Sequence, residues 1–306
     1  MLSFLGRRLA AMVPTLLVII TIAFFLIRMV PGGPFDLDRP LDPVALENLK
    51  RVYGLDRSLP EQYIAYLSAL LRGDFGPSMV IRDFSVRDIF AAGLPVSIRI
   101  GGLALGLAVL LGLALGVAAA VRRNSLVDYG VMAVATLGTS VPTFVTAPLF
   151  QIVFGLSLAW LPVGGWNDGA VRNTILPVLT LALPQVAVIA RLSRAAMIET
   201  LRAHPIRTLQ AQGLHQRTIL SHALRGALLP VLSYLGPAAA HLLTGSLVVE
   251  TIFGLPGIGR YFIEGALSRD YTLVMGTVVV IALFVLLFNI LVDIAYALID
   301  PRVRHG

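Results

Sequence analysis

Six uncharged stretches limit most strongly how this chain can fold. They are Leu9–Ile27, Ile100–Val121, Tyr129–Asn167, Asn173–Ala190, Gly226–Val249 and Tyr271–Val292. An apolar helix needs about 20 residues to cross the hydrocarbon core of a bilayer. Only 13% of the residues are charged, against about 25% in a typical soluble domain. The sequence therefore predicts an all-α polytopic membrane protein with six transmembrane helices.

The first stretch, Leu9–Ile27, looks at first like the apolar part of a secretory signal peptide. It is 19 residues long, whereas such regions typically have about 7–15 residues. No small-x-small cleavage site follows it, because the chain continues as PGGPFD. We therefore interpret residues 1–30 as the N-terminus and an uncleaved first transmembrane helix.

The third stretch, Tyr129–Asn167, is too long for one straight transmembrane helix, because it contains 39 residues. It ends in AWLPVGGWNDG, whose glycine, proline and tryptophan residues suit an interfacial turn. We predict one helix over about 129–159, and the alternative is two short half-helices. The other transmembrane helices of the core, residues 95–306, are predicted over about 95–121, 175–197, 227–250 and 271–298, with 198–226 outside the lipid.

The distribution of arginine and lysine predicts the orientation of the chain. With the N-terminus inside, the inner segments hold 12 basic and 3 acidic residues, whereas the outer segments and span ends hold 12 of each. The positive-inside rule then places both termini in the cytoplasm, which agrees with an even number of spans. We attribute the net charge of +7 to this topology and expect contact with a lipid bilayer and no nucleic-acid partner.

Residues 31–94 have mixed charges and turn signals, and they are predicted to form a folded external cap. In DPVALENLKRVYG, Asp42 can cap a helix that has Pro43 at its first position and ends at Gly54. SLPEQYIAYLSALLRG is predicted to form a second helix that stops at Gly73. The alternative is a loop that only connects two spans.

Motifs for enzymatic chemistry are missing from the sequence. It has no GxxxxGK[ST] loop for ATP, no HExxH zinc motif and no GxSxG elbow with a plausible partner. It has no cysteine for a disulfide or a thiolate metal site. We therefore predict a non-enzymatic chain with no catalytic residue, metal site or cofactor of its own. An intramembrane enzyme is the alternative, and it lacks a nucleophile–base pair.

Few ionisable residues lie inside the apolar stretches. His241 is the one nearest the middle of a predicted span, and we name His241 and Thr244 as possible residues of a transport pathway. A secondary transporter driven by an ion gradient needs paired buried charges or broken helices. The scarcity of such charges weighs against that alternative, although helices could be broken at Pro142, Pro148, Pro177 and Pro184. Any uphill transport would therefore draw its energy from another source.

Small residues recur in the second apolar stretch, where GLALG places glycines four residues apart. This spacing favours close packing against another helix. The glycines concerned are Gly101, Gly102, Gly106, Gly112 and Gly116.

Residues 207–232, RTLQAQGLHQRTILSHALRGALLPVL, combine basic and apolar residues between two apolar stretches. Gly213 can end one helix with a positive φ, and HQRTILSHALR can begin another at an angle to it. Leu229 and Pro230 are expected to mark the return into lipid. We predict an elbow of two short helices that a soluble partner can bind; the alternative is a basic loop that serves only the positive-inside rule.

The elbow sequence resembles the EAA-loop signature of ABC importer permeases from the dipeptide, oligopeptide and nickel branch. TLQAQGL and HALRGALLPVL stand where that branch usually has TARAKGL and HALRNALLPVL. The chain departs at Leu209, Gln210, Gln212 and Gly226, which removes the basic residues of the family at 210 and 212.

Other segments resemble the same family in the same order, over nearly the whole chain. They are the first apolar stretch with its PGGPF exit, LPVGGWNDGA, VVETIFGLPGIGRYFIEGALSRDYTLV and the C-terminal YALIDPRVR. The length and the Gly-Gly-Trp-Asn loop are most similar to the B-type membrane subunits of oligopeptide permeases.

The resemblance implies a type I ABC importer permease fold in the bacterial inner (cytoplasmic) membrane. Its partners would be a second homologous permease subunit in a heterodimer, two ATPase subunits that bind ATP and Mg, and an extracytoplasmic peptide-binding protein. Oligopeptides are the expected substrate, with dipeptides, nickel and glutathione as alternatives.

The resemblance also implies roles for individual residues. Leu214, Ile219 and Leu220 would be apolar anchors in an ATPase groove, and Glu250 would be structural. The expected ATPase-coupling residues are Arg207, Thr208, Leu209, Ala211, Gly213, Leu214, His215, Arg217, Ile219, Leu220, His222 and Arg225. The expected external mouth comprises Glu250, Thr251, Phe253, Gly254, Pro256, Gly257 and Gly259.

Overall fold

The computed structural model describes residues 2–35, 42–81 and 84–299. In these ranges the chain is helical and contains no strand. It forms two compact units, one comprising Ser97–Leu255 and the end of the last helix from Leu287, and the other comprising Leu2–Val96 and Pro256–Leu286. Two long helices, α4 (Val86–Val121) and α11 (Tyr271–Ile299), contribute to both units.

Within the described residues, five helices are long and apolar enough to cross a membrane. They agree with five of the six stretches predicted from the sequence. They are α1 (Leu2–Met29), α4, α7 (Val171–Arg202), α9 (Gln216–Phe253) and α11. A bent pair of shorter helices would bring the number of spans to six.

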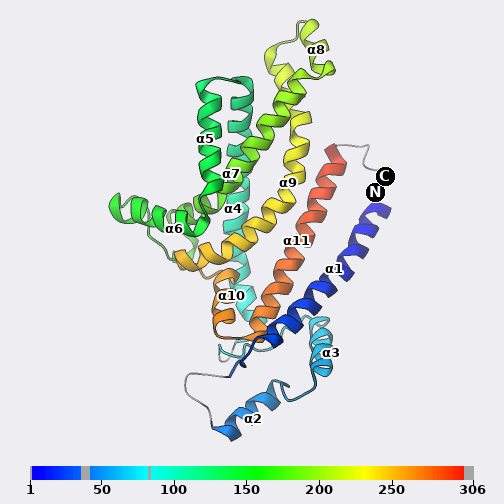
Figure 1. The fold of residues 1–306 in the computed structure, drawn as a ribbon, viewed down its shortest axis with the longest axis vertical. Coiled ribbons are helices and arrows are strands. Elements are labelled where there is room, and N and C mark those ends of the chain that lie inside the picture. The colour runs from blue at the N-terminus through cyan, green and yellow to red at the C-terminus, as the bar shows by residue number, and fades with distance from the viewer. Residues whose placement is uncertain (1, 36–41, 82–83, 300–306) are drawn as a thin grey trace. The chain divides into compact units, whose positions relative to one another are not determined.

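The third predicted helix, 129–159, is broken in the structure. Helix α5 (Leu126–Ser140) ends before Pro142, and α6 (Thr143–Phe150) with the π-helical turn η1 (Gln151–Ser157) leaves at 104° to it (Figure 1). Proline cannot donate a backbone hydrogen bond and disfavours helical geometry in the residue before it, and Val141 is accordingly extended. The prediction of one helix was wrong, and the alternative of two half-helices describes the structure.

In the first unit, two glycines of α4 allow a close approach to α7. A Cβ atom at Gly112 would lie 2.7 Å from Ile189 Cβ, and one at Gly116 would overlap the Ser193 hydroxyl. Ser193 Oγ also donates to the Gly112 carbonyl across 3.3 Å. A Cβ atom at Gly101, Gly102 or Gly106 would meet no atom of another described segment within 4 Å. The predicted close packing is therefore confirmed only at Gly112 and Gly116.

The second unit contains α1, the two helices predicted for the cap, and α10 (Ile258–Leu267). Both cap helices are confirmed as α2 (Pro43–Val52) and α3 (Leu59–Leu70). Asp42 Oδ1 accepts a bond from the Val44 N–H at 3.1 Å, and Gly54 and Gly73 have the positive φ values expected after each helix. The aromatic ring of Phe24 is buried against α3 and α11.

A buried carboxylate fastens the segment after α3 to the start of α11. Asp270 is fully buried. It accepts hydrogen bonds from the Ser78 hydroxyl, from the Met79 and Val80 N–H groups at 3.0 and 3.3 Å, and from Leu273 N–H at 3.0 Å. One side chain therefore caps α11 and holds three consecutive residues of the cap.

Candidate coupling surface

The elbow predicted around Gly213 begins with α8 (His204–Ala211), which follows α7 (Figure 1). Gly213 has φ +74°, and its N–H donates to the Gln210 carbonyl at 3.0 Å. The Leu214 N–H donates to the Leu209 carbonyl at 3.3 Å. A left-handed residue in this position is characteristic of helix ends and favours glycine. The predicted end of the helix at Gly213 is confirmed.

The second half of the elbow differs from its prediction. Helix α9 runs from Gln216 through Leu229 and Pro230 to Phe253 without an interruption. Its 38 residues span about 57 Å at roughly 1.5 Å per residue. The turn after α8 is therefore attached directly to a helix that is long enough to cross a membrane.

The inner face of the elbow belongs to a hydrophobic core. Ile206 of α8 and Ile219 and Ala223 of α9 are buried together with Met197 of α7 and Ala120 of α4. Moving α8 by itself would expose this apolar surface to water, at a cost of about 25 cal/mol per Å². The core therefore ties α8 to three long helices.

This core corrects one of the predicted anchors. Ile219 is only 8% exposed, so it is not available to a partner. Leu209 and Leu220 are partly buried against the same cluster. Leu214 is 40% exposed and is the one predicted apolar anchor that faces outward. Helical spacing identified an amphipathic segment but did not show that its apolar face is covered by the chain itself.

The outer face of the elbow is basic and exposed. Residues 204–225 contain no aspartate or glutamate, so this face favours a partner of opposite charge. Gln210 and Gln212, where the chain departs from the family pattern, are also exposed. The predicted residues that lie on this face are Arg207, Thr208, Ala211, Gly213, Leu214, His215, Arg217, His222 and Arg225.

The substitution at Gly226 has a packing explanation. A Cβ atom at this position would lie 3.0 Å from the Thr200 Cγ2 atom of α7. This distance is tighter than ordinary van der Waals contact. Glycine therefore lets α9 approach α7 directly beside the elbow.

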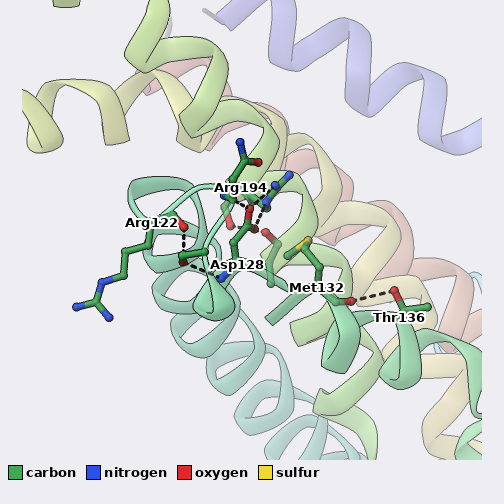
Figure 2. A network of polar contacts seen from close by, with 9 residues as sticks. Arg122, Asp128, Met132, Thr136 and Arg194 are labelled. Carbon is green, nitrogen blue, oxygen red and sulfur yellow. Dashed lines mark hydrogen bonds and ion pairs between the residues drawn. The ribbon is translucent and has the colours of Figure 1, made fainter. Parts of the chain in front are cut away.

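An ion pair holds α7 to α5 near the elbow. Arg194 Nη2 lies 2.7 Å from Asp128 Oδ2, and Arg194 Nε donates to Asp128 Oδ1. Asp128 Oδ2 also accepts from the Asn124 N–H at 2.9 Å. Figure 2 shows Arg194 directed at Asp128, while the side chain of Arg122 points away from the pair. In the sequence, Asp128 and Arg194 are only two of the charges of the inner segments, and nothing there predicted their contact across 66 positions.

At its other end, α9 packs against the Gly-Gly-Trp-Asn loop. Glu250 is fully buried, in agreement with a structural role, and Phe253 is 2% exposed. Gly254, with φ +64°, ends the helix, and the Gly165 N–H donates to the Phe253 carbonyl at 2.7 Å. A Cβ atom at Gly164 would lie 2.6 Å from that carbonyl oxygen. Glycine is therefore required where the loop meets the helix end.

The seven residues predicted for the external mouth are divided between the two units. Those from Glu250 to Gly254 belong to the first unit, whereas Pro256, Gly257 and Gly259 belong to the second. In the second unit, Gly257 caps α10 and Gly259 is buried. The mouth stays a prediction as a single site.

The two residues predicted for the pathway lie on α9. His241 is exposed. The side chain of Thr244 lies outside the described part of the structure, as do Asp300 and Arg302 of the IDPR motif. The pathway assignment stays a prediction.

Comparison with known proteins places the chain in a family. Residues 112–305 match the family described as binding-protein-dependent transport system inner membrane component, and residues 1–79 match its N-terminal counterpart.

The chain is 48% identical over 306 residues to the oligopeptide transport system permease protein OppB of Escherichia coli (strain K12), covering 100% of both chains. OppB of Haemophilus influenzae is 47% identical over 306 residues, again covering 100% of both chains. The dipeptide transport system permease protein DppB of Bacillus subtilis is 42% identical over 305 residues, covering 99% of this chain and 98% of the relative. The chain therefore belongs to the family of binding-protein-dependent transport system inner membrane components.

Proposed function

We propose that this chain is a membrane permease subunit of an ABC importer for oligopeptides and forms half of the translocation pathway. The observation that carries the proposal is the elbow, an exposed basic surface whose inner face is locked into a core with α4, α7 and α9. Full-length identity of 48% to a relative named as an oligopeptide permease supports the substrate. The chain is a multi-pass protein of the inner membrane.

The energy for transport would come from partner chains. Two ATPase subunits would bind ATP and Mg and hydrolyse ATP, so the permease itself acts as a transport subunit and not as an enzyme. A second homologous permease would complete the pathway as a heterodimer. An extracytoplasmic peptide-binding protein would deliver the substrate to the side opposite α8.

The packing explains how a force on α8 would reach the other end of the helices. Helices α4 and α7 interlock at Gly112 and Gly116, and Asp128 adds α5 through Arg194. Helix α7 extends over 32 residues, or about 48 Å at 1.5 Å per residue. Because packed helices transmit strain and compress little, movement of the elbow would displace α7 and α9, the two helices that flank it.

The same helices carry that displacement to the Gly-Gly-Trp-Asn loop. Asn173, in the first turn of α7, donates to the Gly164 and Gly165 carbonyls at 3.1 and 3.0 Å. The Gly165 N–H is bonded to the end of α9 at Phe253. A change at the ATPase surface would therefore alter the loop that both helices hold, which provides a physical route for switching access.

The substrate is tested by uptake in bacteria that lack their own peptide permeases and express this chain with its partner subunits. We expect uptake of labelled tripeptides to pentapeptides that stops when the ATPase is inactivated and continues after a protonophore collapses the ion gradient. Preferred uptake of dipeptides, nickel or glutathione would replace oligopeptides by that cargo. Uptake that survives ATPase inactivation but stops with the protonophore would support an ion-driven carrier, to which the bend between α5 and α6 would then be relevant.

A further inference from the structure

Two adjoining cavities lie among the cap helices of the second unit. The larger, of about 290 Å³, lies between α3, the end of α2 and the segment 74–79. The smaller, of about 200 Å³, lies between α2 and residues 33–35. Arg28, Leu55 and Gln62 line both cavities, so these three residues form a shared wall.

The walls of these cavities carry an excess of positive charge. Arg51 and Arg57 join Arg28 in the larger cavity, and Lys50 lines the smaller one. Arg51 Nη2 also lies 3.8 Å from Glu47 Oε1, but both side chains are exposed and such a pair is weak. Asp74 is the single acidic residue in the two described linings, and its Oδ1 atom already accepts from the Gly76 N–H at 2.8 Å. The space therefore favours a ligand with a negative charge.

Arg28 is held in place by neutral groups. Its Nε donates to Gln62 Oε1 at 3.1 Å, and its Nη1 donates to the Phe24 carbonyl at 3.3 Å. Its guanidinium also lies 3.5 Å from the centre of the Phe24 ring. These contacts fix the direction of the side chain, and no acidic group among the described residues forms an ion pair with it.

Tyr66 lines the larger cavity, and its hydroxyl is covered by the surrounding atoms. Its hydroxyl is buried and has no hydrogen-bond partner among the described residues. Burial raises the pKa of Tyr66 to about 12, so the hydroxyl keeps its proton at neutral pH. A buried donor without a partner is unfavourable, and a phosphate oxygen that the Tyr66 side chain turned to meet would remove that penalty.

The position along the chain indicates where the anion comes from. Arg28 lies in the last turn of α1 and Thr272 of the larger cavity lies in the first turn of α11. Both helices are apolar enough to cross a membrane, so their ends mark the depth of the lipid headgroups. Met29 and Val52, beside the cavities, are 77% and 78% exposed and can contact acyl chains there.

We propose that these cavities bind the phosphate group of a phospholipid with net negative charge, in the leaflet at the end of α1. Arg28 and Tyr66 hold the phosphate oxygens from the wall, and Arg51 and Arg57 contact them from the rim. Guanidinium groups suit this role because their planar donors match phosphate in a bidentate geometry. The inference concerns anchoring in the membrane and is independent of the cargo.

The test uses the intact transporter complex in nanodiscs and native mass spectrometry to count retained lipids. The variants are Arg51→Gln/Arg57→Gln, which leaves the buried Arg28 in place, and Tyr66→Phe. Arg72→Gln is the matched control, because Arg72 is an exposed arginine just after α3 that lines neither cavity. Thermal unfolding of each variant confirms that it is folded.

We expect the wild type to retain phosphatidylglycerol in preference to phosphatidylcholine. The double variant should lose about tenfold in affinity, as expected for the loss of charge-assisted hydrogen bonds, Tyr66→Phe should bind more weakly than wild type, and Arg72→Gln should be unchanged. Equal retention of the two lipids by wild type, or equal phosphatidylglycerol retention by the double variant, would overturn the proposal. Inorganic phosphate that stabilises the detergent-purified complex through the same arginines, without lipid retention, would assign the cavities to a soluble anion and overturn the lipid source.

Discussion

Arg194 and Asp128 form an ion pair with two hydrogen bonds between α7 and the first turn of α5, and Arg194 Nη2 lies 2.7 Å from Asp128 Oδ2. Asp128 is 1% exposed and the Arg194 side chain is 26% exposed. Arg194 lies on α7, which leads directly into α8. The ion pair therefore holds the helix that carries the elbow against α5.

Replacing Asp128 by alanine should destabilise the first unit. Removing one partner of a fully buried ion pair costs about 3–5 kcal/mol, and the partial exposure of Arg194 lowers our expectation to about 2–3 kcal/mol. Thermal unfolding of the complex in nanodiscs measures the loss. Arg122→Ala is the control, because its side chain points away from the pair (Figure 2). An Asp128→Ala complex with the unfolding temperature of wild type would show that the pair contributes nothing.

Replacing glycine by alanine on α4 should destabilise the protein where the glycine is in close contact with α7, and should be tolerated where it is not. Gly116→Ala would place a Cβ atom against the Ser193 hydroxyl and 2.5 Å from the Ala190 carbonyl oxygen, and overpacking of this kind costs about 1–3 kcal/mol. Gly106→Ala meets no such neighbour within 4 Å and should be neutral, or stabilising by up to about 1 kcal/mol from helix propensity. Thermal unfolding compares them. The packing between α4 and α7 is incorrect if the two variants unfold alike.

Backbone conformation should decide which residues are tolerated at Gly213. A Cβ atom at Gly213 would meet no atom of another described segment within 4 Å, but φ at this residue is +74°. Valine would therefore be strained by roughly 1–2 kcal/mol without any clash, whereas asparagine adopts this conformation more readily. We expect Gly213→Val to retain about tenfold less ATPase in affinity purification and Gly213→Asn to retain nearly normal amounts. Normal retention and transport by Gly213→Val would contradict the role of this turn.

Removing the Asp270 carboxylate should loosen the cap. Asp270→Ala would leave the Ser78 hydroxyl and the Met79 and Val80 N–H groups without their buried acceptor. Each orphaned donor costs about 1–3 kcal/mol when it stays buried, so the segment should open instead. Faster amide exchange at residues 78–81 is the expected result, with Asp56→Ala, an exposed position in the cap, as the control. Unchanged exchange in Asp270→Ala would show that this carboxylate does not hold the segment.

Local signals in the sequence predicted much of the fold. Apolar stretches located the long helices because membrane spans need continuous apolar length. Asp42, Gly54 and Gly73 marked the limits of the cap helices, and Gly213 marked the end of α8, because capping and positive φ depend on nearby residues. Pro142 also signalled a break, but only the structure shows a bend of 104° there.

Contacts between distant residues could not be predicted in this way. Asp128 and Arg194 are 66 positions apart, and Ser78 and Asp270 are 192 apart, so no local periodicity relates them. Ile219 lies in an amphipathic segment, yet the core formed with α4, α7 and α8 decides that it faces inward. A single sequence shows which residues are apolar but not which partner covers them.

Cross-linking from the elbow tests the coupling surface most directly. Because the chain has no native cysteine, each introduced cysteine is the single one in this subunit. Gln210→Cys and Leu214→Cys lie at exposed positions, whereas Ile219→Cys lies at a buried one. Each is labelled in membrane vesicles with a maleimide photo-cross-linker after the partner subunits are co-expressed. We predict ATPase adducts from residues 210 and 214 and none from residue 219. An assembled complex that yields no ATPase adduct from either exposed position would contradict the proposal that α8 is the surface through which ATP hydrolysis drives transport.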